Sequence, residues 1–208
     1  MLAFQRSLFD VDEAPGLRPL GDAVERTELD GGAWVDVRRD WVTGGEVVFE
    51  ELLDAVAWRA ERRPMYDRVV DVPRLVAFFG ESDGLPHPLL GECLGALNSH
   101  YRPEPGDEVA TAGLCLYRDG ADSVAWHGDT IGRGATEDTT VAIVSLGDRR
   151  GLQLRPKGGG PRLRFDVGAG DLLVMGGSCQ RTWEHAVAKT RRPVGPRISV
   201  QFRPSGVQ

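Results

Sequence analysis

The half of the chain that follows Gly106 consists of short apolar runs separated by turn residues. The runs are rich in Val, Ile, Leu and Phe, and none keeps helical spacing for long. There are eight of them: 111–117, 123–127, 140–146, 151–155, 162–167, 171–175, 182–188 and 197–203. A parallel sheet would need crossover connections, usually helices, between its strands. This half therefore predicts a double-sheet jelly roll.

A chain of 208 residues is long enough for one domain with a full core. We expect a single domain over 1–208, with residues 1–105 as an N-terminal extension, helices and substrate lid, and 106–208 as the jelly-roll core. Residues 1–42 show no sustained period, so we expect irregular structure with one short strand near 32–37. The fold class is α+β, mainly β with flanking helices.

Two segments of the first half have helical spacing. One helix is predicted from Phe49, because apolar residues recur at helical intervals up to Ala57, with Thr43 and Glu46 upstream as a capping box. A second helix is predicted over 88–99, where leucines gather on one face.

Charge and cysteine content limit the class of protein. The net charge of -6 argues against binding to nucleic acid through bulk positive charge. Residues 1–104 carry a net charge of -9 and residues 105–208 one of +3, so an anionic ligand should meet the C-terminal half. Three cysteines cannot all pair within one chain, and their spacing fits no zinc or redox motif. With no signal-peptide or membrane-spanning run, we expect a cytoplasmic protein with reduced thiols.

One pattern has the geometry of a metal site. His127 and Asp129 are two residues apart, so on an extended chain both side chains leave the same face. Alone, such a pair is more often a satisfied polar pair than a ligand set. His185, on another predicted strand, is the best third ligand, whereas we expect His87 and His100 to be solvated. Two histidines and one carboxylate are typical of non-haem iron(II) oxygenases.

The last predicted strand alternates strictly between polar and apolar residues. Its apolar face carries Ile198, Val200 and Phe202, and its polar face carries Arg197, Ser199, Gln201 and Arg203. Two arginines inside a small barrel would be costly unless an anion lies between them. The alternative is an outward-facing polar strand with two solvated arginines.

Taken together, these motifs resemble the AlkB family of iron(II)- and 2-oxoglutarate-dependent nucleic-acid dealkylases. The resemblance runs from about Trp58 onward through Met65-Tyr66, Val72-Pro-Arg-Leu75, Tyr117-Arg-Asp-Gly120, Trp126-His-Gly-Asp129, Ser145-Leu-Gly147, Leu173-Val-Met-Gly176, Trp183-Glu-His185 and the pair Arg197 and Arg203. It implies a double-stranded β-helix fold, which is a jelly roll, and an N-terminal lid over the substrate base.

The resemblance also implies roles for individual residues. Iron would be bound by His127, Asp129 and His185. Arg197 would pair with the distal carboxylate of 2-oxoglutarate and Tyr117 would hydrogen-bond the same co-substrate. Arg203 would lie near the keto-acid end and Asp129. The implied substrate contacts are Arg74, Phe78, Phe79, Trp126 and Ile131; for the first three, core or lid packing is the alternative.

Three positions depart from the family pattern. The family usually has asparagines that touch 2-oxoglutarate at the positions of Cys115 and Ser199, so co-substrate binding is expected to be weaker or differently arranged. Ser199 remains a candidate co-substrate contact. Many members also have an acidic residue, which reads the damaged base, where this chain has Ile131.

The implied activity is oxidative dealkylation of N-alkylated bases in DNA or RNA, as in DNA repair, with release of aldehyde, succinate and CO₂. The base must be flipped or single-stranded to reach such a centre. We expect a monomer without a membrane partner. One alternative keeps the chemistry but hydroxylates a protein side chain or small metabolite; the acidic charge and Ile131 favour it, and a basic stretch over 149–164 opposes it. A second alternative is a catalytically silent nucleic-acid-binding module.

Overall fold

The computed structural model describes residues 13–65 and 68–207. The strands of the first half are β1 (Gly16–Leu17), β2 (Glu25–Glu28), β3 (Ala33–Arg38), β4 (Val42–Thr43), β5 (Arg59–Met65) and β6 (Arg68–Phe79). Those of the second half are β7 (Val109–Tyr117), β8 (Val124–His127), β9 (Val141–Gly147), β10 (Arg150–Pro156), β11 (Leu163–Val167), β12 (Leu172–Gly177), β13 (Trp183–Val187) and β14 (Arg197–Pro204). All of their pairings are antiparallel.

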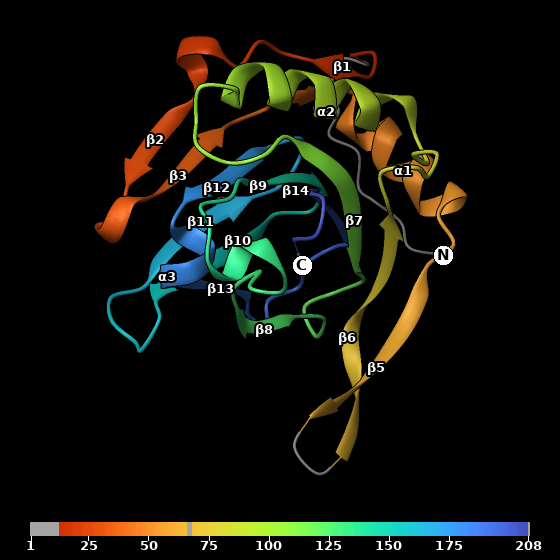
Figure 1. Cartoon of the computed structure of the whole chain (residues 1–208). Helices are drawn as coiled ribbons and strands as arrows, with labels where there is room; N and C mark the ends of the chain where they lie inside the picture. Colours follow the sequence, from red (N-terminus) through yellow and green to blue (C-terminus); the bar gives the residue numbers. More distant parts are fainter. Residues whose placement is uncertain (1–12, 66–67, 208) are drawn as a thin grey trace.

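Two sheets form the body of the molecule. The larger has eight strands in the order β2-β3-β12-β9-β14-β7-β6-β5, and the smaller has four in the order β11-β10-β13-β8. β1 and β4 form a separate pair. This is the jelly roll that the sequence predicts, and β5 and β6 run together away from its body (Figure 1).

Helices cover one side of the larger sheet. α1 (Gly45–Ala55) and α2 (Pro88–Tyr101) lie over it (Figure 1), and α3 (Cys179–Thr182) immediately precedes β13. Single 3₁₀ turns form at η1 (Gly21–Ala23), η2 (Asp30–Gly32) and η3 (Arg133–Ala135). Within residues 13–65 and 68–207, no helix is long and apolar enough to cross a membrane.

The eight predicted runs became β7 to β14, and both predicted helices are present. The predicted strand near 32–37 is present as β3, but the expectation of irregular structure in the rest of this segment was wrong, because β1, β2 and β4 also form; β5 and β6 were not predicted. The capping box was also wrong. Thr43 instead pairs in β4 and donates to the carbonyl oxygen of Ala14 at 2.8 Å, while the N-cap is Gly44 at φ +58°. A Cβ at Gly44 would lie within 2.8 Å of the Ala14–Pro15 backbone, so glycine is required there.

Strand alternation divides the apolar side chains between two cores. On β9, Ala142, Val144 and Leu146 face the helices, whereas Val141 and Ile143 face the smaller sheet. The helix-side core also takes the apolar face of β14, namely Ile198, Val200 and Phe202. The core between the sheets includes Leu152 and Leu154 from β10 and Met175 from β12. Because side chains alternate along a strand, the polar face of β14 points toward the space between the sheets.

Candidate active site

The three predicted metal ligands lie together. One donor atom from each of His127, Asp129 and His185 falls within 4.8 Å of the others. His127 and His185 face each other in the pairing of β8 with β13, and their ring centroids are 4.2 Å apart. Asp129 follows β8 directly and is 3% exposed. Two imidazoles and one carboxylate in this arrangement fit the facial triad of non-haem iron(II).

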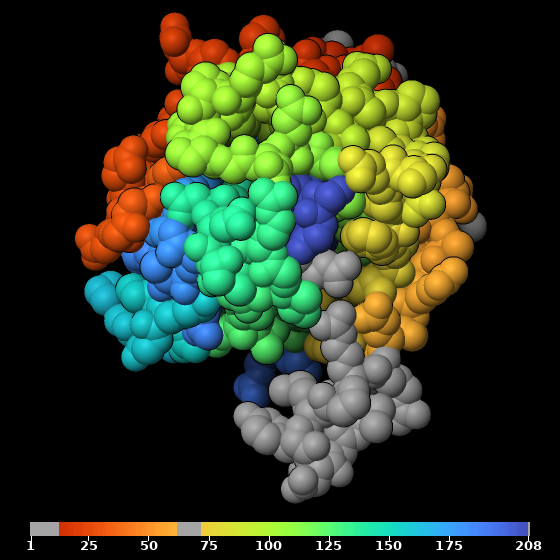
Figure 2. Space-filling view, viewed as in Figure 1, coloured from red at the N-terminus to blue at the C-terminus, as the bar shows by residue number. Residues whose placement is uncertain are grey.

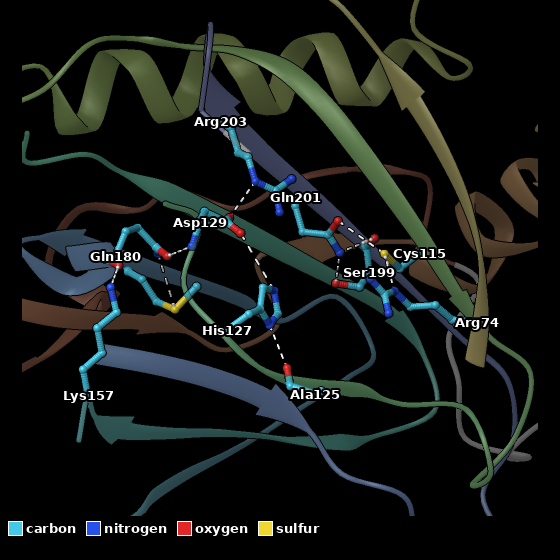
Figure 3. A network of polar contacts seen from close by, with 11 residues as sticks. Arg74, Cys115, Ala125, His127, Asp129, Lys157, Gln180, Ser199, Gln201 and Arg203 are labelled. Atoms are coloured by element: carbon cyan, nitrogen blue, oxygen red, sulfur yellow. Dashed lines mark hydrogen bonds and ion pairs between the residues drawn. The ribbon is translucent and has the colours of Figure 1, made fainter. Parts of the chain in front are cut away.

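Neighbouring groups orient the donor atoms. The Nδ1 of His127 lies 2.8 Å from the carbonyl oxygen of Ala125, to which it donates, so Nε2 keeps its lone pair for a metal. Asp129 accepts from Arg203 Nε on Oδ2 at 2.7 Å, while its Oδ1 lies 3.8 Å from Nε2 of His127. Figure 3 shows these contacts around Asp129. Oδ1 of Asp129, which Arg203 does not bind, and the two imidazoles are therefore directed at a common position for a metal ion.

Electrostatics keep Asp129 and His185 in the forms that bind a metal. Burial raises the pKa of Asp129, but the charge of Arg203 and the two histidines outweigh it, so the pKa lies below its ordinary value. Burial, with a smaller contribution from His127, lowers the pKa of His185 to about 3. At neutral pH the site thus offers a carboxylate and a neutral buried imidazole, which are the forms that bind a metal.

These shifts predict acid-sensitive stability. An unfolded histidine takes up a proton near pH 6.5, whereas folded His185 does so only near pH 3. The metal-free protein should therefore lose stability as the pH falls below about 6.5, by up to about 1.4 kcal/mol per pH unit for this residue. The lowered pKa of Asp129 acts in the same direction. Urea unfolding between about pH 7 and about pH 5 measures the slope. His185→Asn should flatten it, and equal slopes in His185→Asn and the natural protein would contradict the assignment.

Two residues that the sequence analysis did not single out shape the centre. Gln180, 1% exposed on α3, accepts the backbone N–H of Asp129 on Oε1 at 2.9 Å. Gly128 packs against the same segment, because a Cβ there would lie 2.6 Å from the carbonyl oxygen of Gln180. Their contacts join α3 to the β8 loop, and no local pattern in the sequence signals them.

Arg197 is buried in the space between the sheets. It is 1% exposed, which rules out the outward-facing alternative for this residue. Its Nη2 donates to Ser145 Oγ at 2.6 Å, while Nε and Nη1 are buried and have no hydrogen-bond partner among the described residues. Burial lowers the pKa of Arg197, since a charged guanidinium without a counter-ion is destabilised there. Nε and Nη1 lie on different edges of the guanidinium, and each has an N–H that can be donated to an anion.

Tyr117 lies beside this guanidinium, which is 5.3 Å from the ring centroid. Burial raises the pKa of Tyr117 to about 12, so its hydroxyl stays protonated at neutral pH and can donate a hydrogen bond. Arg150 lies on the same ring at 5.6 Å, but its donors bind the carbonyl oxygens of Asp119, Asp122 and Ala188. Of the two arginines, Arg197 is therefore the one whose guanidinium has N–H groups that are unpartnered within the described part of the chain and can bind a ligand.

A cleft of about 1550 Å³ opens next to the triad. Its walls come from β6, β7, β8 and β14, and His127, Asp129 and Arg203 line it. Figure 2 shows the last described residues of the chain, in violet, lying between the teal loop that follows β8 and the yellow part of β6. Tyr117, Ser199 and Arg197 do not line the cleft and lie deeper.

All five candidate substrate residues line this cleft. Phe78 and Ile131 are 54% and 68% exposed, which is unusual for large apolar side chains and places them on its open side. Phe79 also packs against the helix-side core. Arg74 donates to Cys115 Sγ at 3.3 Å and to a backbone carbonyl, so it is tied to β7. The Trp126 ring lies against Arg155, at 4.3 Å, and Arg162.

The remaining histidines lie outside the site. The expectation that His87 is solvated was wrong: its Nδ1 caps α2 by accepting the N–H of Leu89, and Nε2 pairs with Glu51 at 2.7 Å. The first backbone N–H groups of a helix have no partner within the helix, and the His87 ring accepts one of them. His100 packs edge-on against Tyr101.

Comparisons with known proteins agree with this geometry. A family model described as the 2OG-Fe(II) oxygenase superfamily matches residues 48–203. The alpha-ketoglutarate-dependent dioxygenase alkB homolog 3 of Homo sapiens is 28% identical over 190 residues, which cover 82% of this chain and 63% of that protein. The DNA oxidative demethylase ALKBH2 of Arabidopsis thaliana is 33% identical over 140 residues, which cover 56% of this chain and 43% of that protein.

The solved structure of OsALKBH1 has a similar fold, with a TM-score of 0.58 at 15% identity, over 85% of this chain and 100% of that one. The chain spans about three fifths of the length of the alkB homologs 3 that it matches. The family match extends over three quarters of the chain and includes all three triad residues. The chain therefore belongs to the 2OG-Fe(II) oxygenase superfamily, whose co-substrate and metal are 2-oxoglutarate and iron(II), and its relatives are AlkB homologues.

Proposed function

We propose that the protein is an iron(II)- and 2-oxoglutarate-dependent dioxygenase that removes alkyl groups from N-alkylated bases of DNA or RNA. The observation that carries this proposal is the His127–Asp129–His185 cluster beside a wide cleft, with the unsatisfied guanidinium of Arg197 buried behind it. The proteins named as alkB homolog 3 and DNA oxidative demethylase support the choice of substrate.

Each residue of the site has a separate role in the proposed reaction. His127, Asp129 and His185 would hold iron(II), which supplies the oxidising chemistry. Arg197 would bind the distal carboxylate of 2-oxoglutarate through N–H groups that have no partner among the residues the structure describes, with Tyr117 as a further donor and Ser199 beside it. Arg203 holds Asp129 and its charge attracts the other, keto-acid end of the co-substrate.

The overall reaction balances without another reductant. 2-Oxoglutarate loses CO₂ and becomes succinate, supplying two electrons to O₂. One oxygen atom enters succinate and the other enters a C–H bond of the alkyl group next to nitrogen. The bond between the base nitrogen and the hydroxylated carbon then breaks. The nitrogen keeps the electron pair and takes the hydroxyl proton, and the carbon leaves as an aldehyde.

Access to the cleft favours an extruded base. A base stacked in a duplex cannot reach a centre whose ligands Asp129 and His185 are 3% and 6% exposed, so a flipped or single-stranded base is required. Phe78 and Ile131 offer apolar surface for stacking. We propose that the protein acts as a monomer in the cytoplasm and takes part in DNA repair.

The basic stretch over 149–164 gives little support to nucleic-acid binding. Arg155 pairs with Glu184, Arg164 with Asp166, and Lys157 donates to the Gln180 carbonyl. These groups are engaged within the protein. The test therefore also has to detect the alternative activity, hydroxylation of a protein side chain or small metabolite.

The test is succinate formation with iron(II), 2-oxoglutarate and methylated single-stranded oligonucleotides, with the oligonucleotide mass measured in parallel. Loss of the alkyl mass together with succinate supports the proposal. Succinate formed from peptides or metabolites but not from oligonucleotides would establish the alternative target. No succinate with any substrate would indicate a silent binding module.

Base selectivity gives a further prediction. Within the described residues, the carboxylates lining the cleft belong to Glu61 and Asp129; Glu137 pairs with Arg133. With Ile131 at the cleft, we expect ethenoadenine, which lacks the exocyclic amine, to be penalised less relative to 1-methyladenine and 3-methylcytosine than in relatives with an acidic residue at this position.

Ile131→Asp should add an acceptor for the exocyclic amine and favour the two amine-bearing bases by about 1–3 kcal/mol, or roughly 5- to 150-fold. Relative kcat/KM in matched single strands measures this preference, and Ile131→Ala controls for side-chain size. A strong amine preference in the natural protein that Ile131→Asp leaves unchanged would show that Ile131 is not at the reading position.

A further inference from the structure

Gln201 occupies the polar face of β14 between the two arginines. It is 9% exposed, and its carboxamide is held on both sides. Nε2 donates to the backbone oxygen of Ser199 at 3.0 Å and to its Oγ at 2.7 Å, and Oε1 accepts from Cys115 Sγ at 3.6 Å (Figure 3). Ser199 and Cys115 face each other in the pairing of β14 with β7.

Space for this carboxamide comes from a glycine. Gly113 is opposite Gln201 in the same pairing, and a Cβ there would lie 3.3 Å from Gln201 Oε1 and 3.0 Å from Arg203 Nη1. Any larger residue at position 113 would crowd both side chains. The backbone thus leaves room for two polar groups to lie side by side at the cleft wall.

Gln201 also lies on the route to the buried arginine. Residues two apart on a strand face are separated by about 7 Å, so Gln201 comes after Arg203 and before Arg197 along this face. Arg203 and Gln201 line the cleft, whereas Arg197 is buried behind it. A small dicarboxylate that reaches from the triad to Arg197 must therefore pass the Gln201 carboxamide.

We infer that Gln201 is a co-substrate-binding residue that hydrogen-bonds 2-oxoglutarate between its two ends, with Ser199 and Cys115 setting the orientation of the carboxamide. This role rests on the proposed function, because it takes 2-oxoglutarate to lie between the triad and Arg197. The ligand oxygens need a donor, and an amide nitrogen has two N–H groups. One of the two bonds from Nε2 to Ser199 would be exchanged for a bond to the ligand.

The two departures from the family pattern then have a shared explanation. Cys115 and Ser199 are the two residues that bind the Gln201 carboxamide. Cys115 also accepts from Arg74 Nε, so the same chain of contacts reaches the candidate lid on β6. Cys115 and Ser199 are thus positioning residues, and the carboxamide is supplied by position 201.

The test is 2-oxoglutarate binding measured by calorimetry with Mn(II) in place of iron, so that turnover plays no part. Gln201→Leu, which keeps the volume but removes the carboxamide, should weaken 2-oxoglutarate binding at least about ten-fold. Mn(II) affinity should change less than about two-fold, because Gln201 has no contact with the triad among its recorded hydrogen bonds. The matched control is Gln153→Leu, a glutamine on β10 that lines the same cleft, which should leave 2-oxoglutarate binding unchanged.

A double-mutant cycle tests whether Cys115 acts by orienting the Gln201 carboxamide and not by contacting 2-oxoglutarate itself. Cys115→Ala should weaken 2-oxoglutarate binding in the natural protein and have no further effect beside Gln201→Leu. If Gln201→Leu binds 2-oxoglutarate as tightly as the natural protein does, the inference is overturned while the proposed function stands. If the natural protein itself fails to bind 2-oxoglutarate, the proposed function fails too. Gln201→Asn, whose amide is one methylene shorter, gives the same comparison should Gln201→Leu not fold.

Discussion

His185→Ala is expected to abolish turnover without unfolding the protein. His185 faces His127 across the β8–β13 pairing, and within the described residues theirs is the one cluster of metal-ligating side chains with donors this close. Without the second imidazole the site keeps one histidine and one carboxylate, too few for stable iron(II) binding. We expect the rate to fall at least about a thousand-fold, equivalent to about 4 kcal/mol of transition-state stabilisation. Succinate release measures the rate, and circular dichroism measures the fold.

A graded comparison makes the result specific to the metal. Gln180→Leu keeps all three ligands but removes the acceptor for the Asp129 N–H. Its metal affinity should fall about 10- to 100-fold, less than for His185→Ala. Full iron-dependent activity in His185→Ala would exclude the assignment of this residue as a ligand.

The second large effect is expected for Arg197→Lys, which should raise the 2-oxoglutarate concentration needed for half-maximal rate about 10- to 100-fold. A lysine has a single ammonium and cannot reproduce the planar guanidinium, whose Nε and Nη1 have no partners among the described residues. Iron affinity should change little, because Arg197 does not contact the triad in its recorded hydrogen bond to Ser145.

Arg150→Lys is the matched control, since Arg150 lies as near the Tyr117 ring but uses its donors on three backbone carbonyls. It should lower the thermal unfolding midpoint and leave the 2-oxoglutarate requirement within about two-fold of the natural value. Identical 2-oxoglutarate titrations for Arg197→Lys and the natural protein would place the dicarboxylate elsewhere.

The sequence by itself determined the local elements and the candidate ligands. Short apolar runs bounded by turn residues identified β7 to β14, because a strand with a core on each face is apolar on both faces. The alternation of side chains along a strand placed His127 and Asp129 on one side, and it placed Arg197 and Arg203 opposite the apolar face of β14. These features depend on residues that are close in the chain, so the spacing of residues in the sequence is enough to predict them.

Only the tertiary structure decided which distant groups meet. The Gln180–Asp129 bond spans 51 residues and the contact between Cys115 and Gln201 spans 86. The Arg203–Asp129 ion pair, which spans 74, was implied by the family resemblance and not by residue spacing. The inclusion of β5 and β6 in the larger sheet likewise depends on the pairing of β6 with β7 and of β5 with β6. Such contacts are set by strand order and register, which the hydrophobic pattern of one segment does not encode. The physical reason is that burial and hydrogen-bond partners are properties of the assembled sheets, while alternation is a property of each strand.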